Sequence, residues 1–468
     1  MVRKNLLGTA LAFIALLLSG TSASAARDVA GDWSGKIQGM LRLVLHVQHG
    51  AGGYTGTLDS PDQGAMGLAI DALTVAGDSL RFEMSALRVN YAARLSATGD
   101  TLTGEWSQAG MSLPLSFARG IEAPRHTQEV WPPYPYDTLA VSVPNRSAPG
   151  VILAGTLTEP KGKGPFPAVV LITGSGPEDR DETIFGHRPF RVLADHLTRQ
   201  GIAVLRLDDR GVGSSTGKFR GLTSEDFAGD ALASVEFLRA RKEIGKIGLI
   251  GHSEGGLIAP MVANRSGDVA FVVLMAGPAI RGDSLLMLQS TVLRRAMGVG
   301  EETLTREREV SRRLYAAIQQ NDSTAAARAM RELVGLQIGG AAGASYGAVN
   351  PDSIAASAMR QFWSPWMKFF VSYDPVPALQ RLKCPVLALN GSKDLQVPPA
   401  ENLAGMRSAL ARGGNQDVTV QELPNLNHLF QTAQTGAVIE YASIEETIAP
   451  VALDTISKWI VARTGGKR

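Results

Sequence analysis

Residues 246–260 read KIGLIGHSEGGLIAP, and this stretch decides the fold. An apolar run ends in Gly-His-Ser-Glu-Gly, and small and apolar residues of helical character follow it. The pattern predicts a strand, a sharp turn with Ser253 at its apex, and a helix. Such a turn strains the serine backbone, so the flanking positions must lack side chains that would collide with the strand and the helix. G-x-S-x-G alone is a weak pattern, and an incidental serine in a glycine-rich turn is the alternative.

The chain after residue 150 alternates between strand-like and helix-like segments. The expected helices include Phe190–Arg199, Glu225–Arg241, Leu257–Ala263 and a closing helix at Ile444–Val461. Strands are expected at Val151–Leu157, Ala168–Thr173, Ala203–Leu207, Ile247–Ile250, Val269–Met275, Val386–Asn390 and Val418–Leu423. The middle strands are continuously apolar, as expected when helices cover both faces of a parallel sheet. We therefore predict an α/β domain over residues 150–468 with a mostly parallel sheet, in which ligands bind beyond the carboxyl ends of the strands.

Two polar stretches follow the later strands. Asp394 comes after the strand expected at 386–390, and His428 comes after the last strand. The chain order Ser253, Asp394, His428 is the order expected for a catalytic triad on this architecture. In it the serine is the nucleophile, the histidine transfers the proton and the aspartate orients the histidine. Asp374 and Glu401 are poorer candidates for the acid, because neither follows a strand.

The other histidines are poorer candidates for the base. His252 belongs to the turn itself. His187 precedes the helix expected at Phe190–Arg199, His196 lies within it, and His126 lies in the predicted connector.

A glycine-containing stretch, residues 173–181, follows the strand expected at 168–173 and reads TGSGPEDRD. We predict that the N–H of Ser175 and the N–H of Glu254 form the oxyanion hole, with Gly176 as the alternative to Ser175. An ordinary tight turn is the competing interpretation. Arg180 and its acidic neighbours are interpreted as a structural ion network beside the site.

A nucleotide site at residues 208–215, DDRGVGSS, is excluded. The P-loop needs a Lys-Ser/Thr pair, and the dinucleotide fingerprint needs a third glycine that opens a helix; both are absent here. We predict no cofactor and no metal.

Together these motifs resemble the α/β-hydrolase superfamily, and within it exported bacterial esterases close to the serine aminopeptidase and prolyl-oligopeptidase-like branches. The resemblance covers about residue 151 to the C-terminus. It implies a Ser-His-Asp carboxylic ester hydrolase that needs no cofactor. One departure is Thr173, at a position where many relatives carry histidine, and it bears on the oxyanion hole rather than on the triad.

The N-terminus has the features of a removable export signal. Arg3 and Lys4 precede an apolar run too short to span a bilayer, and Ala23-Ser24-Ala25 is a cleavage site, so residues 1–25 are predicted to be a signal peptide. Its removal deletes two positive charges and no acid, and the formal net charge falls from +2 to zero. A neutral mature protein gives no electrostatic case for nucleic acid or membrane binding. We expect a periplasmic or secreted protein with no stable membrane insertion.

Residues 27–120 are predicted to form a small antiparallel β domain, either a barrel or a sandwich. Polar and apolar residues alternate along residues 41–48, and GDSL at 77–80 and GDTL at 99–102 each open a strand after a turn. His46 and His49 are interpreted as surface histidines, since no carboxylate is near them in the sequence. The proline-rich residues 121–149 are predicted to be a connector that resists helix and central strand.

Between residues 279 and 377 the alternation breaks down, which predicts a helical cap inserted into the catalytic domain. Helical patterns at Leu285–Gly298 and Thr303–Gln320 are followed by a glycine-rich segment, Gly335–Gly347, and an aromatic cluster at Phe362–Phe370. The aromatic side chains line an acyl pocket or pack the core of the cap; the sequence leaves both open.

The sequence therefore predicts an exported serine hydrolase that cleaves small-molecule carboxylic esters. A serine peptidase, an aminopeptidase or an acyltransferase on the same fold is an alternative. A binding protein with an inert hydrolase fold is another, and the complete set of Ser253, Asp394 and His428 argues against it. Arginines in the predicted cap favour esters over substrates with a free amino terminus.

Overall fold

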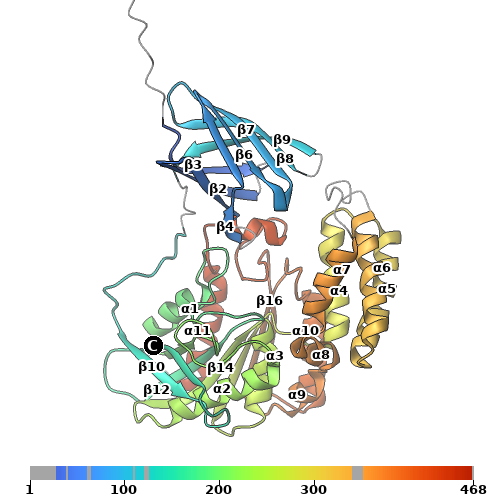
Figure 1. The fold of residues 1–468 in the computed structure, drawn as a ribbon. Coiled ribbons are helices and arrows are strands. Elements are labelled where there is room, and N and C mark those ends of the chain that lie inside the picture. Colours follow the sequence, from blue (N-terminus) through green and yellow to red (C-terminus); the bar gives the residue numbers. More distant parts are fainter. Residues whose placement is uncertain are drawn as a thin grey trace, which may run out of the picture.

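The structure is a computed structural model that describes residues 28–37, 41–60, 65–108, 111–120, 126–339 and 351–465. The predicted signal peptide and part of the glycine-rich segment lie outside these residues. Figure 1 shows two sheet-containing parts and a group of helices beside the second part. No helix in these ranges is long and apolar enough to cross a membrane.

The N-terminal part is one nine-stranded antiparallel sheet with the strand order β4-β3-β2-β1-β9-β8-β7-β6-β5. The strands are β1 (Gly31–Ile37), β2 (Leu41–Gly50), β3 (Gly53–Ser60), β4 (Ala65–Ala69), β5 (Ala72–Ala76), β6 (Ser79–Met84), β7 (Val89–Leu95), β8 (Thr101–Gln108) and β9 (Met111–Arg119). Alternate residues of these strands form a single core that includes Trp33, Phe82 and Phe117. Leu73 on β5 lies against Gly56 on β3, so the two ends of the sheet approach each other, as in a barrel.

The sequence analysis found no carboxylate near His46, and this is wrong, because two carboxylates contact its ring. Its two ring nitrogens contact Asp32 Oδ1 at 2.7 Å and Asp59 Oδ2 at 2.9 Å. Both acids come from the neighbouring strands β1 and β3, and cross-strand neighbours are not visible in the local sequence.

The C-terminal part is an eight-stranded mixed sheet with the order β10-β11-β13-β12-β14-β15-β16-β17. The strands are β10 (Asp137–Pro144), β11 (Ile152–Glu159), β12 (Phe166–Ile172), β13 (Ala203–Leu207), β14 (Ile244–His252), β15 (Val269–Met275), β16 (Val386–Gly391) and β17 (Val418–Leu423). Strands from β13 across to β17 run parallel, whereas β10 and β11 are antiparallel to their neighbours. The sheet is therefore mixed at one edge and parallel in its middle.

Helices cover both faces of this sheet (Figure 1). The helices α1 (Pro189–Arg199) and α11 (Pro450–Thr464) pack on one face. The helices α2 (Ser224–Arg239), α3 (Glu254–Ala263), α9 (Val376–Arg381) and α10 (Pro399–Arg412) pack on the other. The closing helix begins at Pro450 rather than at Ile444, because a residue before proline disfavours the α conformation and proline is well placed in a first turn.

The connector contains a strand that the sequence analysis did not predict. β10 lies at the edge of the sheet, where a proline is tolerated, and Pro144 is its last residue. Upstream of it, the side chain of Gln128 donates to the carbonyl of Ile448 and accepts from the N–H groups of Thr447 and Ile448. This segment is thus bound to the C-terminal part at two places, through β10 and through Gln128.

The insertion between β15 and β16 forms the group of helices beside the sheet (Figure 1). It contains α4 (Gly282–Ala296), α5 (Glu301–Gln319), α6 (Ser323–Gly339), α7 (Pro351–Phe362) and α8 (Pro365–Ser372). The first residues of the predicted glycine-rich segment continue α6. Phe362 and Trp363 join the core of these helices, and Phe370 is buried against the core of the sheet, so core packing is the role that the structure supports for the aromatic cluster.

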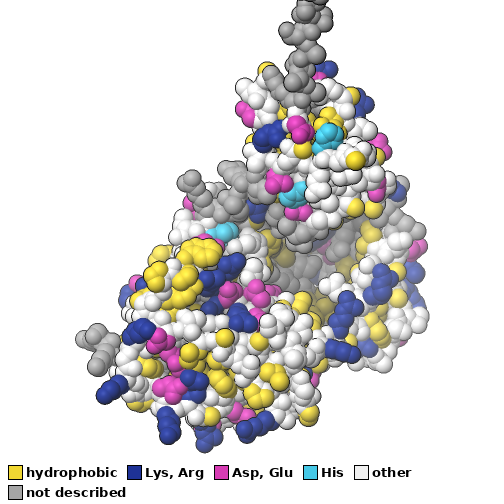
Figure 2. Space-filling model, turned by 60° about the vertical axis from the view of Figure 1, so that its left-hand side comes forward, with side chains coloured by type: hydrophobic (Ala, Val, Ile, Leu, Met, Phe, Trp, Pro, Cys, Tyr) yellow, Lys and Arg dark blue, Asp and Glu magenta, His cyan; other side chains and the backbone are white. Residues whose placement is uncertain are grey.

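Figure 2 shows that Lys, Arg, Asp and Glu side chains are interspersed over the visible face of both parts. This mixture agrees with the formal net charge of +2, which is close to zero for a chain of 468 residues. Since a high local density of one sign is what attracts polyanions, this face offers no extended basic surface.

Candidate active site

The turn at Ser253 has the geometry of a nucleophile elbow. β14 ends at His252, α3 begins at Glu254, and Ser253 between them has φ 52° and ψ −117°, a strained conformation for a residue with a side chain. A Cβ on Gly251 would lie 2.0 Å from the carbonyl oxygen of Gly255, and one on Gly255 would lie 2.1 Å from that of Ile172. The glycines are therefore required by close backbone contact, and the serine lies at the apex of the turn.

His428 and Asp394 lie together after the neighbouring strands β17 and β16. The Nδ1 of His428 is 2.8 Å from Asp394 Oδ2, and both residues are buried. The other oxygen of Asp394 accepts hydrogen bonds of 2.8 Å from the N–H groups of Gln396 and Val397. Because Nδ1 is bound to the carboxylate, Nε2 is the ring nitrogen left to exchange a proton with a substrate or a hydroxyl.

The loop of His428 contacts the elbow through His252. The Nε2 of His252 donates to the backbone carbonyl of His428 at 2.9 Å, and the two rings have centroids 4.9 Å apart. Among the described residues, the hydroxyl of Ser253 forms no hydrogen bond with His428. In enzymes without substrate such bonds are often long and tighten only in the complex.

His252 also forms a buried ion pair, which the sequence analysis did not predict. Its Nδ1 is 2.9 Å from Glu182 Oε1, and both side chains are nearly inaccessible to solvent. Since each ring nitrogen faces an acceptor, both must carry a hydrogen, and the ring is an imidazolium. Burial by itself lowers the pKa of His252, but the charge and hydrogen bond of Glu182 outweigh it and raise this pKa to about 9. Nothing in the local sequence marks Glu182, which comes from a loop.

The same carboxylate oxygen holds the loop predicted to form the oxyanion hole. Glu182 Oε1 accepts from the N–H of Gly174 at 2.9 Å, and a Cβ on Gly174 would lie 3.4 Å from the Cβ of Ser253. The loop is therefore close to the elbow. The backbone N–H groups of Ser175 and Glu254 form no hydrogen bond with any other described residue, and Ser175 is exposed.

The carboxylate of Glu254 faces α8, a helix of the insertion between β15 and β16. It accepts from Ser224 Oγ at 2.5 Å and from the indole N–H of Trp366 at 2.8 Å. Burial is the largest influence on this carboxyl and raises its pKa. Glu254 thus connects the first turn of α3 to α8, and its side chain has a structural partner on each side.

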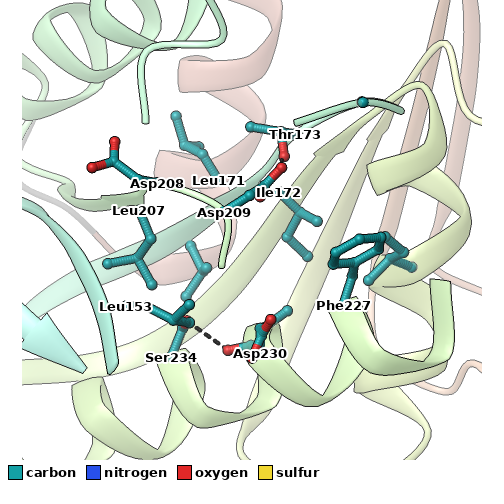
Figure 3. Close-up of a pocket in the computed structure, with 15 residues that line it drawn as sticks. Leu153, Leu171, Ile172, Thr173, Leu207, Asp208, Asp209, Phe227, Asp230 and Ser234 are labelled. Carbon is teal, nitrogen blue, oxygen red and sulfur yellow. Dashed lines mark hydrogen bonds between the residues drawn. The ribbon is translucent and has the colours of Figure 1, made fainter. Parts of the chain in front are cut away.

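A small cavity of about 50 Å³ lies under the predicted oxyanion loop, between β12, β13 and α2 (Figure 3). Asp209 and Thr173 lie side by side at one end of it, and Thr173 Oγ1 donates to Asp209 Oδ1 at 3.2 Å. Asp209 also accepts from the N–H of Glu178 at 3.0 Å. Burial is the main cause that raises the pKa of Asp209 to about 7 and that of Glu178 to about 8. Thr173 is therefore part of a hydrogen-bonded support of this loop.

Arg180 forms the ion network expected from the sequence. Its Nε and Nη2 contact the two oxygens of Asp208 at 2.9 and 2.6 Å. The alternative site residues lie elsewhere: Asp374 accepts from the N–H of Val376 in a turn, and Glu401 lies in the first turn of α10. Among the described residues, neither of these two carboxylates forms a hydrogen bond with His428.

No group of three or more His, Cys, Asp or Glu side chains in the described ranges is arranged to hold a metal ion. His187 contacts Thr447 and the carbonyl of Tyr441, and His196 contacts Ser457. These histidines have structural partners.

With this geometry, the chain can be compared with known proteins. Residues 188–337 match the family described as serine aminopeptidase, S33. The esterase EstD of Thermotoga maritima is 29% identical over 315 residues, which is 66% of this chain and 65% of the relative, so the chain covers just under two thirds of that protein. The resemblance to α/β-hydrolases near the serine aminopeptidase branch, predicted from the motifs, is confirmed by these matches.

Two solved structures are similar to this chain at low identity. An esterase of Pyrococcus furiosus has 14% identity and a TM-score of 0.42, with 74% of this chain and 98% of that chain covered. A proline iminopeptidase of Mycobacterium smegmatis has 14% identity and a TM-score of 0.42, with 69% and 98% covered.

Proposed function

We propose that this protein is an exported serine hydrolase that cleaves carboxylic esters with Ser253, His428 and Asp394. The observation that carries the proposal is the buried hydrogen bond of 2.8 Å between His428 and Asp394, in a loop that contacts the elbow bearing Ser253. A base held by an acid beside a strained serine is the arrangement that activates a hydroxyl nucleophile.

In this mechanism the Ser253 hydroxyl attacks the ester carbonyl while His428 Nε2 takes its proton. Asp394 keeps the ring in the required tautomer and stabilises the imidazolium. The N–H groups of Ser175 and Glu254 bind the oxyanion, each stabilising the transition state by about 3 kcal/mol. His428 then protonates the departing alcohol, and a water molecule, activated by the same nitrogen, hydrolyses the acyl-enzyme.

Two observations favour esters over peptides, and one favours peptides. The relative from T. maritima is named an esterase, which favours esters. The family matched by residues 188–337 is named for aminopeptidases, which favours peptides. An aminopeptidase needs a free acid to bind the substrate ammonium group. In the cap many acids are paired with arginines: Asp283, Glu301, Glu302, Glu307, Glu332 and Asp352. Peptide cleavage is the second candidate.

The test is turnover of short-chain nitrophenyl esters and of aminoacyl anilides by the mature protein, by Ser253→Ala and by Ser266→Ala. Ser266 is a matched control, because it lies in a turn after α3, and among the described residues its hydroxyl hydrogen-bonds to Asp268 alone. We expect ester turnover that falls by about 10⁴-fold or more in Ser253→Ala and is unchanged in Ser266→Ala. Ester turnover that survives in Ser253→Ala would show that Ser253 is not the nucleophile. Turnover of anilides alone would favour the peptidase.

Export is proposed from residues 1–25. Intact mass measurement of the protein recovered from the periplasm of a bacterial host should give a chain that begins at Ala26. A full-length chain retained in the cytoplasm or membrane fraction would contradict the proposal.

A further inference from the structure

A second pocket lies on the face of the sheet covered by α1, under the proline-rich segment. Its volume is about 190 Å³, well above what a single water molecule needs. Three arginines line it, Arg180, Arg191 and Arg206, with Asp181 as the single acid. It shares no lining residue with the elbow or with the loop of His428.

The charges of this pocket do not cancel. Arg180 is bound through two nitrogens by Asp208. Arg191 and Arg206 share the carboxylate of Asp181, with Arg191 Nη1 at 3.9 Å and Arg206 Nη1 in direct contact. Two guanidinium groups thus face one carboxylate, and one positive charge is in excess.

One of these two guanidinium groups, that of Arg206, is buried, and that of Arg191 is partly exposed. Arg206 is 7% exposed, and its Nε has no hydrogen-bond acceptor among the described residues. Burial, and the nearby charges of Arg191 and Arg180, lower the pKa of Arg206 although Asp181 opposes them. Because two guanidinium groups share one carboxylate in a partly buried pocket, a bound anion that neutralises the remaining positive charge would be favourable here.

Two hydroxyl groups that line the pocket, those of Tyr134 and Thr156, can present a hydrogen to an anion. Tyr134 OH accepts from Arg191 Nη2 at 3.1 Å, and Thr156 Oγ1 accepts from Arg180 Nη1 at 3.0 Å. Since each hydroxyl has accepted a bond, its own hydrogen remains for an acceptor. Guanidinium groups with convergent hydroxyl donors suit planar or tetrahedral oxyanions.

We propose that this pocket binds a small oxyanion, either inorganic phosphate or a carboxylate. Arg180 and Asp181 belong to the loop that also carries Ser175 and Glu182. A ligand that bridges Arg206 and Arg191 at the base of this loop stabilises the loop without touching the catalytic groups.

The test is thermal unfolding and calorimetric titration of the mature protein with sodium phosphate and, separately, sodium acetate, against sodium chloride at equal ionic strength. Arg191→Met removes one guanidinium from the pocket. The matched control is Arg199→Met, on the same helix, where Arg199 pairs with Asp195 one turn away. We expect a saturable increase in Tm and an affinity that falls about ten- to a hundredfold in Arg191→Met but not in Arg199→Met. Ester turnover should be unchanged in both.

Each outcome decides the proposal. Saturable binding of phosphate alone, or of acetate alone, identifies the class of oxyanion. No saturable binding of either anion by the unmodified protein overturns the site, and so does an equal loss of affinity in both variants. Arg206→Met serves as a second variant: if it folds, as judged by ester turnover, it should bind neither anion.

Discussion

The buried pair of Glu182 and His252 gives a prediction in which stability depends on pH. Glu182→Gln keeps the size of the side chain and an oxygen that can accept from Gly174, but it removes the negative charge. His252 is then expected to be neutral near pH 7, and one of its two hydrogen bonds is lost. The perturbation therefore tests whether the imidazolium inferred from geometry is present.

The magnitude follows from the pKa. The pKa of His252 is raised from an ordinary 6.5 to about 9, and each pKa unit corresponds to about 1.4 kcal/mol, so the pair contributes up to about 3 kcal/mol. Because the folded-state pKa is the higher one, this contribution is complete below pH 6.5 and is lost as the pH rises through 9. The destabilisation caused by Glu182→Gln should therefore be about 3 kcal/mol smaller at pH 10 than at pH 6.

The assay is urea unfolding followed by tryptophan fluorescence at pH 6, 8 and 10. Glu225→Gln is the control, since Glu225 is exposed and pairs with Arg265, which keeps its proton throughout. Its effect should stay below about 1 kcal/mol and should not vary with pH. A cost of Glu182→Gln that is the same at pH 6 and pH 10 would refute the imidazolium.

Three further substitutions test the site and the core. Asp394→Asn is expected to lower kcat for nitrophenyl esters by about 10⁴-fold, because the amide favours the wrong tautomer of the catalytic histidine, whereas the surface variant Asp417→Asn should keep full turnover. Phe271 lies in the core between the sheet and α11, and Phe271→Ala should lower the free energy of unfolding by about 3–5 kcal/mol in urea titrations. The control Val451→Ala, at a half-exposed position, should lower it by about 0.5 kcal/mol. Gly255→Ala places a Cβ 2.1 Å from a carbonyl oxygen of β12 and should cost more than about 4 kcal/mol; a stable, active variant would contradict this close contact.

The sequence predicted those parts of the fold that depend on local pattern. The apolar runs at 203–207 and 269–275 coincide with β13 and β15, because strands buried on both faces have a strong signal. β10 was missed because it is an edge strand flanked by prolines, and this proline-rich stretch was interpreted as a connector. Predicting it would have required knowing that β11 offers a free edge, and that depends on the arrangement of the whole sheet.

The candidate site, like the fold, was predicted only where a local sequence pattern marks it. The elbow and the order of Ser253, Asp394 and His428 follow from motifs, and their catalytic roles stay a prediction until the serine variant is measured. Glu182 has φ 53° in a loop, and its partners Gly174 and His252 are 8 and 70 residues away in the sequence. Contacts at such separations leave no local pattern. The bond of Trp366 to Glu254, across 112 residues, was hidden for the same reason.

The strand β10 has a consequence for any attempt to separate the two parts of the chain. A truncated protein that starts at residue 150 would lose β10 and leave the full length of β11 unpaired on one side, and a bare strand edge is a template for intermolecular pairing. It would also lose the contacts of Gln128 with the segment before α11. We therefore expect a fragment that starts near residue 126 to fold on its own, and shorter fragments to aggregate.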